Sequence, residues 1–142
     1  MLENQISKAV VNAAYEVHVN LGPGLLESAY ENALIYELQK AGLYVEKQVE
    51  LPLKYKNIEM ECGYRIDLWV ERDVILELKT VQKFEPIHTT QLLTYLKLTD
   101  NKLGLLINFN STLIKNGIKR VVNNHLKSTA KTLSNINFFL LS

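Results

Sequence analysis

Glu77 and Lys79 are the first residues whose types and spacing could support chemistry, since they flank Leu78 in an otherwise apolar stretch. Side chains alternate between the two faces of a strand, so Glu77 and Lys79 would share one face. Asp67 lies in an earlier segment of alternating apolar and polar residues, and it too points away from the apolar side. If the two segments are antiparallel neighbours, the strands bring Asp67 and Glu77 together.

Two carboxylates at such a position repel each other, and burying them without a partner costs free energy. A divalent cation removes this cost, and oxygen ligands suit Mg²⁺ or Mn²⁺. Such an ion can polarise a phosphoryl oxygen and lower the pKa of a water molecule, while Lys79 could hold that water or stabilise negative charge. The alternative is an ordinary salt bridge from Glu77 or Asp67 to Lys79, and strand spacing alone favours that alternative.

Three predicted strands must position these groups. Apolar and polar residues alternate over residues 49–55 and 60–69, and a third short strand covers residues 74–79. Pro52 predicts either that the first strand lies at a sheet edge or that the backbone nitrogen of this position faces outward, because proline cannot donate to a neighbouring strand. Turns are predicted at Lys56 and Asn57 and at residues 71–73.

Helices precede and follow these strands. Apolar residues at helical spacing predict helices over residues 6–21 and about 26–41, the second ended by Gly42. Pro86 is suited to begin a third helix, which runs to about residue 98. Residues 103–109 read as a central strand, and Asn116 with Gly117 predicts a tight hairpin before a last strand over 118–122. This order predicts an α/β fold with a mixed central sheet flanked by helices, as a single domain over 1–142 with its core at about 3–123. Residues 124–142 are ambiguous.

Composition is that of an ordinary globular protein, with 47% hydrophobic and 22% charged residues and a net charge of +1. The sequence has one cysteine, Cys62, which excludes an internal disulfide framework and fits a reducing cytoplasm. We find no secretory signal and no apolar stretch long enough to cross a membrane. The expected location is therefore the cytoplasm.

Charge is unevenly distributed along the chain. No Asp or Glu follows Asp100, and the segment after it carries six of the 16 basic residues. An acidic part joined to a basic part is typical of a metal-dependent enzyme that acts on polyanions. A solvated basic surface without a partner is the equally weighted alternative.

Three motifs together resemble a known family. Asp67, Glu77 and Lys79 resemble the core signature of the PD-(D/E)XK nucleases, although Ile66 stands where the superfamily name has proline. The spacing of Gly24, Glu27 and Tyr30 is similar to the motif that names the GxxExxY branch of that superfamily. A third motif, which resembles the helix after the catalytic strand, is formed by His88, Gln91 and Tyr95. The resemblance covers about residues 3–123.

The resemblance implies a restriction-endonuclease-like core and a role for each matched residue. Asp67 and Glu77 would bind the metal, with the Leu78 carbonyl as a third ligand, and Lys79 would be the catalytic lysine. Glu27 would reach the metal directly or through water, and Gln91 would contact substrate or water. Residues expected around this site are His88, Tyr30, Tyr95 and Arg65.

Structural alternatives stand beside several of these roles. Glu27 could simply favour the first turn of its helix through the helix dipole. Tyr30 is expected to pack or to orient Glu27 rather than to act chemically. His88 could be a helix-start histidine that solvent satisfies. Arg65 could contact phosphate and Trp69 could stack on a base, although core or rim packing is favoured for Trp69.

The function that follows is a metal-dependent nuclease that uses Mg²⁺ or Mn²⁺ and hydrolyses phosphodiester bonds by metal-activated water, in DNA rather than RNA. One alternative is a catalytically silent nucleic-acid binding module of the same fold. Another is a subunit of a larger assembly, held by the apolar residues 136–141. Small nucleases often pair two sites to cut two strands, so a homodimer is also compatible with the resemblance.

Overall fold

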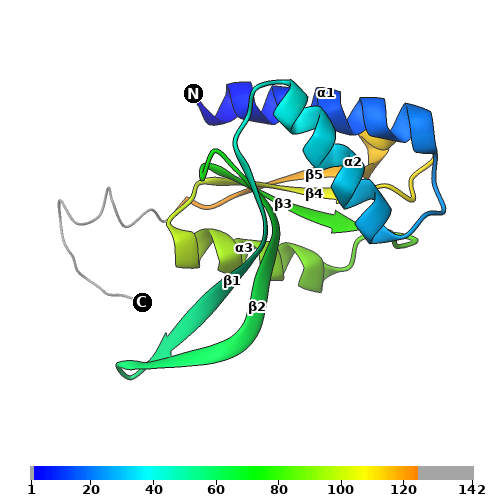
Figure 1. Ribbon diagram of the computed structural model, residues 1–142. Coiled ribbons are helices and arrows are strands. Elements are labelled where there is room, and N and C mark those ends of the chain that lie inside the picture. Colours follow the sequence, from blue (N-terminus) through cyan, green and yellow to red (C-terminus); the bar gives the residue numbers. More distant parts are fainter. Residues whose placement is uncertain (1, 125–142) are drawn as a thin grey trace.

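Five strands form one mixed sheet in the order β1-β2-β3-β4-β5 in the computed structural model, which describes residues 2–124 without the Cys62 side chain (Figure 1). All neighbouring strands are antiparallel except β3 and β4, which are parallel. The strands are β1 (Val45–Tyr55), β2 (Ile58–Val70), β3 (Val74–Lys79), β4 (Leu103–Asn108) and β5 (Ile118–Val122). This sheet confirms the predicted α/β class, and β1 with Pro52 lies at an edge.

Helices cover both faces of the sheet. The helices α1 (Glu3–Leu21) and α2 (Glu27–Lys40) lie on one face, and α3 (Pro86–Thr99) lies on the other (Figure 1). Each face has its own buried apolar cluster. Pro86 begins α3 as predicted, and Gly42 follows α2 with a positive φ of 86°, which glycine adopts without strain. None of the helices among the described residues is long and apolar enough to cross a membrane.

The strands β3 and β4 form the centre of the fold. All of β4 is buried, and β3 is buried from Val74 to Leu78. A parallel pair covered on both faces is expected to be apolar throughout. Glu77 is therefore an exception that the surrounding structure has to accommodate.

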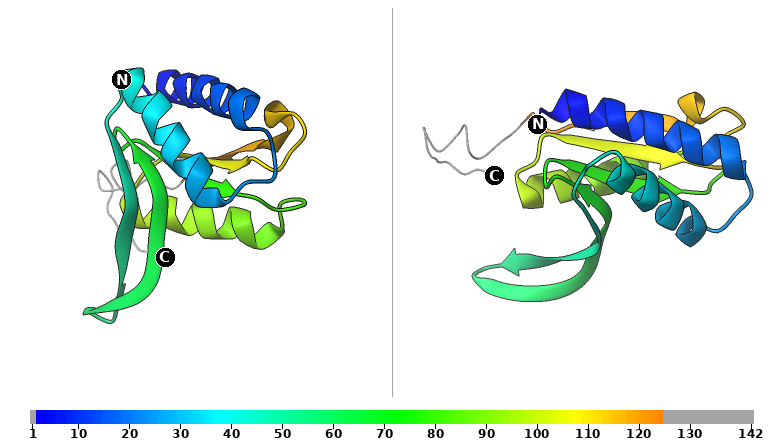
Figure 2. Two further views of the ribbon diagram at one scale, coloured as in Figure 1. Left: turned by 45° about the vertical axis from the view of Figure 1, so that its right-hand side comes forward. Right: turned by 45° about the horizontal axis from the view of Figure 1, so that its top comes forward.

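The hairpin of β1 and β2 extends beyond the rest of the sheet and curves away from it (Figure 2). Pairing between β2 and β3 covers only Leu68 to Val70, although β2 continues to pair with β1 along its length. Ile66 packs in the cluster under α3, whereas Leu68 packs in the cluster under α1 and α2. The predicted common apolar face of these two residues is therefore wrong, because the strand twists between them at Asp67.

The connection from β4 to β5 also differs from the prediction. The two strands pair antiparallel, but residues 109–117 join them and include the 3₁₀ helix η1 (Ile114–Gly117) in place of a two-residue turn. Gly117 lies against the end of β4, where an added Cβ would come within 2.4 Å of the Asn108 carbonyl oxygen. Close packing thus explains this glycine. The tail prediction for residues 124–142 falls, apart from Asn124, outside the described residues.

Candidate active site

The side chains of Asp67 in β2 and Glu77 in β3 each accept a hydrogen bond from the backbone of the other strand, at the point where the two strands separate. The amide of Asp67 donates to Glu77 Oε2 at 3.0 Å, and the amide of Leu78 donates to Asp67 Oδ2 at 2.8 Å. Continuing the register of the ladder would place Asp67 opposite Glu77. Side-chain carboxylates thus take over the backbone hydrogen bonds at the level where regular pairing ends.

Both carboxylates lie in a setting that disfavours their negative charge. Burial, followed by the charge of Asp67, raises the pKa of Glu77 to about 8, and only 5% of this residue is exposed. Burial also raises the pKa of Asp67, against the hydrogen bond from Leu78. A second contribution to the raised pKa of Asp67 comes from the charges of Glu31 and Glu27. The site therefore favours a proton or a cation.

Lys79 ends β3 beside this pair and is partly buried. Its charge lowers the pKa of both carboxylates. Among residues 2–124, however, Lys79 forms no ion pair with Asp67 or Glu77. The ion pair found there within 4.0 Å is between Arg72 and Glu46. The ordinary salt bridge that strand spacing favoured is therefore not formed.

Glu27, in the first turn of α2, reaches the end of β3 from the face opposite α3. Its Oε2 accepts a hydrogen bond from the amide of Thr80, the residue after Lys79, at 3.2 Å. Its carboxylate is thus bound to the backbone of the neighbouring loop, and its negative charge raises the pKa of both Asp67 and Glu77.

Glu31 is a further acidic residue at the site, and our sequence analysis did not single it out. It lies one turn after Glu27 in α2, and its Oε1 accepts from Gln48 Nε2 at 2.7 Å. Gln48 lies opposite Asp67 in the register of β1 and β2 and has a positive φ of 53°. The spacing of four residues on one helix face was the signal that could have identified Glu31.

Tyr30 lies in the core and stacks on Phe109 with ring centroids 4.5 Å apart. Its hydroxyl donates to the Gly22 carbonyl and accepts from the Leu25 amide at 3.1 Å. These bonds fix the loop before α2, which carries Gly24. Tyr30 therefore ties the loop before α2 to the helix that carries Glu27.

Gln91 and Tyr95 form a pair on the face of α3 that packs under the sheet. Gln91 Nε2 donates to the Tyr95 hydroxyl at 3.0 Å. Burial, followed by the negative charge of Glu77, raises the pKa of Tyr95. His88 is placed differently: its Nδ1 accepts from the Glu85 amide at 3.0 Å and caps α3.

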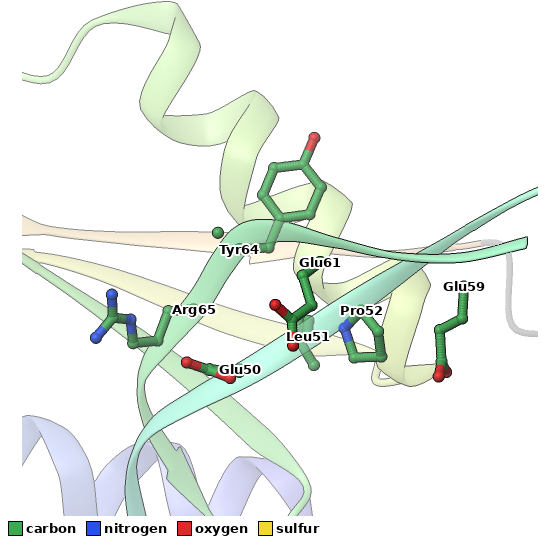
Figure 3. A pocket seen from close by; sticks show the side chains of 8 residues that line it. Glu50, Leu51, Pro52, Glu59, Glu61, Tyr64 and Arg65 are labelled. Carbon is green, nitrogen blue, oxygen red and sulfur yellow. The ribbon is translucent and has the colours of Figure 1, made fainter.

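Arg65 lies along the curved hairpin. It lines a cavity of about 560 Å³ together with Glu50, Glu59 and Glu61 (Figure 3). Neither Asp67 nor Glu77 lines this cavity. The side chain of Arg65 therefore faces the groove of the hairpin, away from the two carboxylates.

The donor set around Asp67 fits a hard divalent cation. Each carboxylate uses one oxygen in the reciprocal hydrogen bonds, and within residues 2–124 the oxygens Asp67 Oδ1 and Glu77 Oε1 accept none. A buried and a half-buried carboxylate, both with raised pKa values and without a paired cation, match the oxygen preference of Mg²⁺ or Mn²⁺. Within the described part of the chain no three His, Cys, Asp or Glu side chains are grouped closely enough to form a complete site. Water would thus complete the shell.

Comparison with known proteins gives one match. A model of the PD-(D/E)XK nuclease superfamily matches residues 4–121, a range that includes β1 to β4, β5 except its last residue, and the acidic residues described above. No curated protein and no solved structure matches the chain.

Proposed function

The chain belongs to the PD-(D/E)XK nuclease superfamily, and we propose that it is a metal-dependent nuclease that hydrolyses phosphodiester bonds in DNA. The observation that carries the proposal is the reciprocal pairing of Asp67 and Glu77 with the backbone, immediately before Lys79. This pairing holds the buried carboxylate of Glu77 and the half-buried carboxylate of Asp67 without neutralising them. Such an arrangement costs free energy unless a cation or a proton is bound.

In the proposed site, Asp67 and Glu77 hold Mg²⁺ or Mn²⁺ together with the carbonyl of Leu78. The bound cation supplies Lewis acidity toward a phosphoryl oxygen and toward water. The backbone amides of Asp67 and Leu78 keep the two carboxylates in fixed orientations, because each amide occupies one carboxylate oxygen. The other oxygen of each carboxylate, Asp67 Oδ1 and Glu77 Oε1, therefore has a fixed orientation in which it can bind the cation.

Lys79 is the proposed catalytic lysine. Its position at the end of β3 and its freedom from an ion pair with Asp67 or Glu77 support this role. An ammonium group here would orient the attacking water and stabilise negative charge on the phosphate. Because Lys79 is only partly buried, a substrate that approaches the C-terminal end of β3 can contact it.

Glu27 and the pair of Gln91 and Tyr95 are proposed to support the site from opposite faces of the sheet. Glu27 is anchored by Thr80 and contributes negative charge near Asp67. Gln91 is anchored by Tyr95 and can contact substrate or water. Membership in the GxxExxY branch is also a proposal, supported by Tyr30, which fixes the helix that carries Glu27.

Basic residues after Asp100 are proposed to contact the nucleic acid. Lys102, Lys115 and Lys119 are exposed, so they are available for phosphate contacts. Arg120 is engaged within the fold, because its guanidinium bonds Asn4 at 2.8 Å and Ser7 at 3.3 Å. The proposal also includes DNA as the substrate and a homodimer that cuts two strands. A cytoplasmic location is proposed as well, and the single cysteine of the chain supports it.

The same exposed lysines favour a second candidate, a catalytically silent nucleic-acid binding module. The two candidates differ in their response to metal and salt. A binding module would retain DNA in chelator and lose it steeply as salt rises, without cutting.

Labelled single- and double-stranded DNA and RNA incubated with the purified protein in Mg²⁺, Mn²⁺ or chelator would separate these candidates. We expect cleavage of DNA with either metal and none in chelator. Retention of DNA in chelator with no cleavage in metal, together with no metal binding by calorimetry, would replace the nuclease with the binding module.

A further inference from the structure

Asn108 is a buried polar residue for which the proposed chemistry has no role. It is the last residue of β4, it is 4% exposed, and it lies directly beside Lys79 in the parallel register of β3 and β4. A buried amide has to find partners for its donors and its acceptor, since an unpaired one is costly. The partners that Asn108 finds are all backbone groups.

The Asn108 side chain continues the β3–β4 ladder beyond the last paired residues. Its Nδ2 donates to the Val81 carbonyl at 2.8 Å, and its Oδ1 accepts from the Val81 amide at 3.1 Å. The same Oδ1 accepts from the Asn110 amide at 3.1 Å. Both polar groups of the Val81 backbone are thus bonded to one side chain.

Thr80 is held between two fixed points as a result. On its N-terminal side, the Lys79 carbonyl accepts from the Phe109 amide at 3.0 Å, and on its C-terminal side Val81 is bonded to Asn108. The Thr80 amide is the group that donates to Glu27. The direction of this amide, and the location of the Glu27 carboxylate, therefore depend on Asn108.

We propose that Asn108 is a positioning residue that fixes Thr80 and Val81, so that the Thr80 amide holds Glu27 beside Asp67 and Glu77. This inference rests on the proposed function, because the benefit of placing Glu27 is a stronger hold on the divalent cation. Groups that orient residues around a metal site change metal affinity by about 10- to 100-fold when they are removed.

A purely structural role for Asn108 would also destabilise the protein on substitution, so a matched residue is needed. Asn123 is 1% exposed, and its Nδ2 donates to the Asn101 carbonyl at 3.2 Å. It follows β5 at the end where Leu103 pairs with Val122, about 16 Å along β4 from Asn108. Asn123→Ala removes a buried asparagine without touching the site.

The test compares the wild type, Asn108→Ala, Asn108→Asp and Asn123→Ala. Amide hydrogen exchange at Thr80 and Val81 in the metal-free protein reports on the loop, and calorimetric titration with Mn²⁺ reports on the site. In Asn108→Ala we expect exchange at both amides to accelerate and Mn²⁺ affinity to fall by about tenfold or more. Asn108→Asp keeps the acceptor for Val81 and Asn110, so its exchange should be intermediate. Asn123→Ala should match the wild type in both measurements.

Unchanged Mn²⁺ affinity in Asn108→Ala, with the wild type binding normally, would overturn this inference and leave the proposed function standing. Equal losses in Asn123→Ala would also overturn it, since a general loss of stability would then be the cause. If Asn108→Ala does not fold, Asn108→Asp decides by the same criteria. If the wild type binds no Mn²⁺, the proposed function fails. Exchange at Thr80 and Val81 that is equally slow in Asn108→Ala and in the wild type would show that Asn108 does not order this loop, and would overturn the inference whatever the metal does.

Discussion

The amide of Asp67 donates to the carboxylate of Glu77 at 3.0 Å, across the level where β2 and β3 stop pairing. Asp67 in turn accepts from Leu78, the residue after Glu77. Neutral amides rather than cations thus hold these two carboxylates, and burial raises the pKa of both. The metal-free site is therefore expected to be a proton site at low pH and a cation site at high pH.

The stability of the metal-free protein should fall as the pH rises. The pKa of Glu77 is about 8 in the folded protein against an ordinary value of 4.5, so the folded state keeps a proton that the unfolded chain releases. Raising the pH from about 4.5 to about 8 therefore lowers the free energy of unfolding, by on the order of 5 kcal/mol over the whole window. Denaturant unfolding in chelator at several pH values measures this dependence.

Substitution of Glu77 provides the control for this pH dependence. Glu77→Gln keeps an acceptor for the Asp67 amide and removes the titrating group, so its stability should fall less across the same window. A residual slope is expected, because the raised pKa of Asp67 acts in the same direction. Wild type and Glu77→Gln with equal slopes would contradict the assignment.

Metal binding should stabilise the protein more at pH 8 than at pH 6, because the cation competes with the protons on Asp67 and Glu77. At a concentration of 100 times its dissociation constant, Mg²⁺ should add about 2.7 kcal/mol, which raises the Tm by roughly 5 to 10 °C. Thermal melts with and without Mg²⁺ test this, and Asp67→Asn, which keeps an acceptor for Leu78, should show no shift. A shift in Asp67→Asn as large as in the wild type would place the ion elsewhere.

Glu31 should contribute to cation affinity although it is bonded to Gln48. Its charge acts on Asp67, so Glu31→Gln should weaken Mn²⁺ binding severalfold while Gln at this position can still bond Gln48. Glu37→Gln on the same helix serves as the matched control, since the acidic residues that raise the pKa of Asp67 and Glu77 include Glu27 and Glu31 but not Glu37. Calorimetric titration would rule out this role if the two variants bind Mn²⁺ equally.

Tyr30→Phe should destabilise the loop before α2 while leaving the stack on Phe109 intact. The hydroxyl bonds both Gly22 and Leu25, so its removal should cost about 1 to 2 kcal/mol in denaturant unfolding. Tyr36→Phe, at an exposed site of the same helix, should cost little. An equal effect of the two substitutions would show that the Tyr30 hydroxyl does not anchor the loop.

Much of the fold was predictable because local patterns and tertiary structure agree. Alternation of apolar residues identified β1 and β2, a continuous apolar stretch identified β4, and Pro86 and Gly42 marked the limits of helices as their backbone restrictions require. The spacing of Asp67, Glu77 and Lys79 indicated neighbouring strands, and β2 and β3 are neighbours. Each of these inferences depends on residues close together in the sequence.

The remaining features depend on tertiary contacts that no local pattern encodes. The twist at Asp67, which separates the faces of Ile66 and Leu68, arises where the hairpin leaves the sheet. The 3₁₀ helix that ends at Gly117 replaces the turn that Asn116 and Gly117 favour, because Gly117 packs on Asn108. The role of backbone amides at the carboxylate pair likewise becomes visible only in three dimensions.

Cleavage of labelled DNA by the wild type, Asp67→Asn and Lys79→Ala in Mn²⁺ tests the central claim most directly. Lys83→Ala, at an exposed lysine of the following loop, is the matched control. We predict that the wild type and Lys83→Ala cut, and that Asp67→Asn and Lys79→Ala lose at least about 100-fold in rate while their circular dichroism spectra remain those of the folded protein. Cleavage by folded Asp67→Asn or Lys79→Ala at the wild-type rate would contradict the assignment of this site.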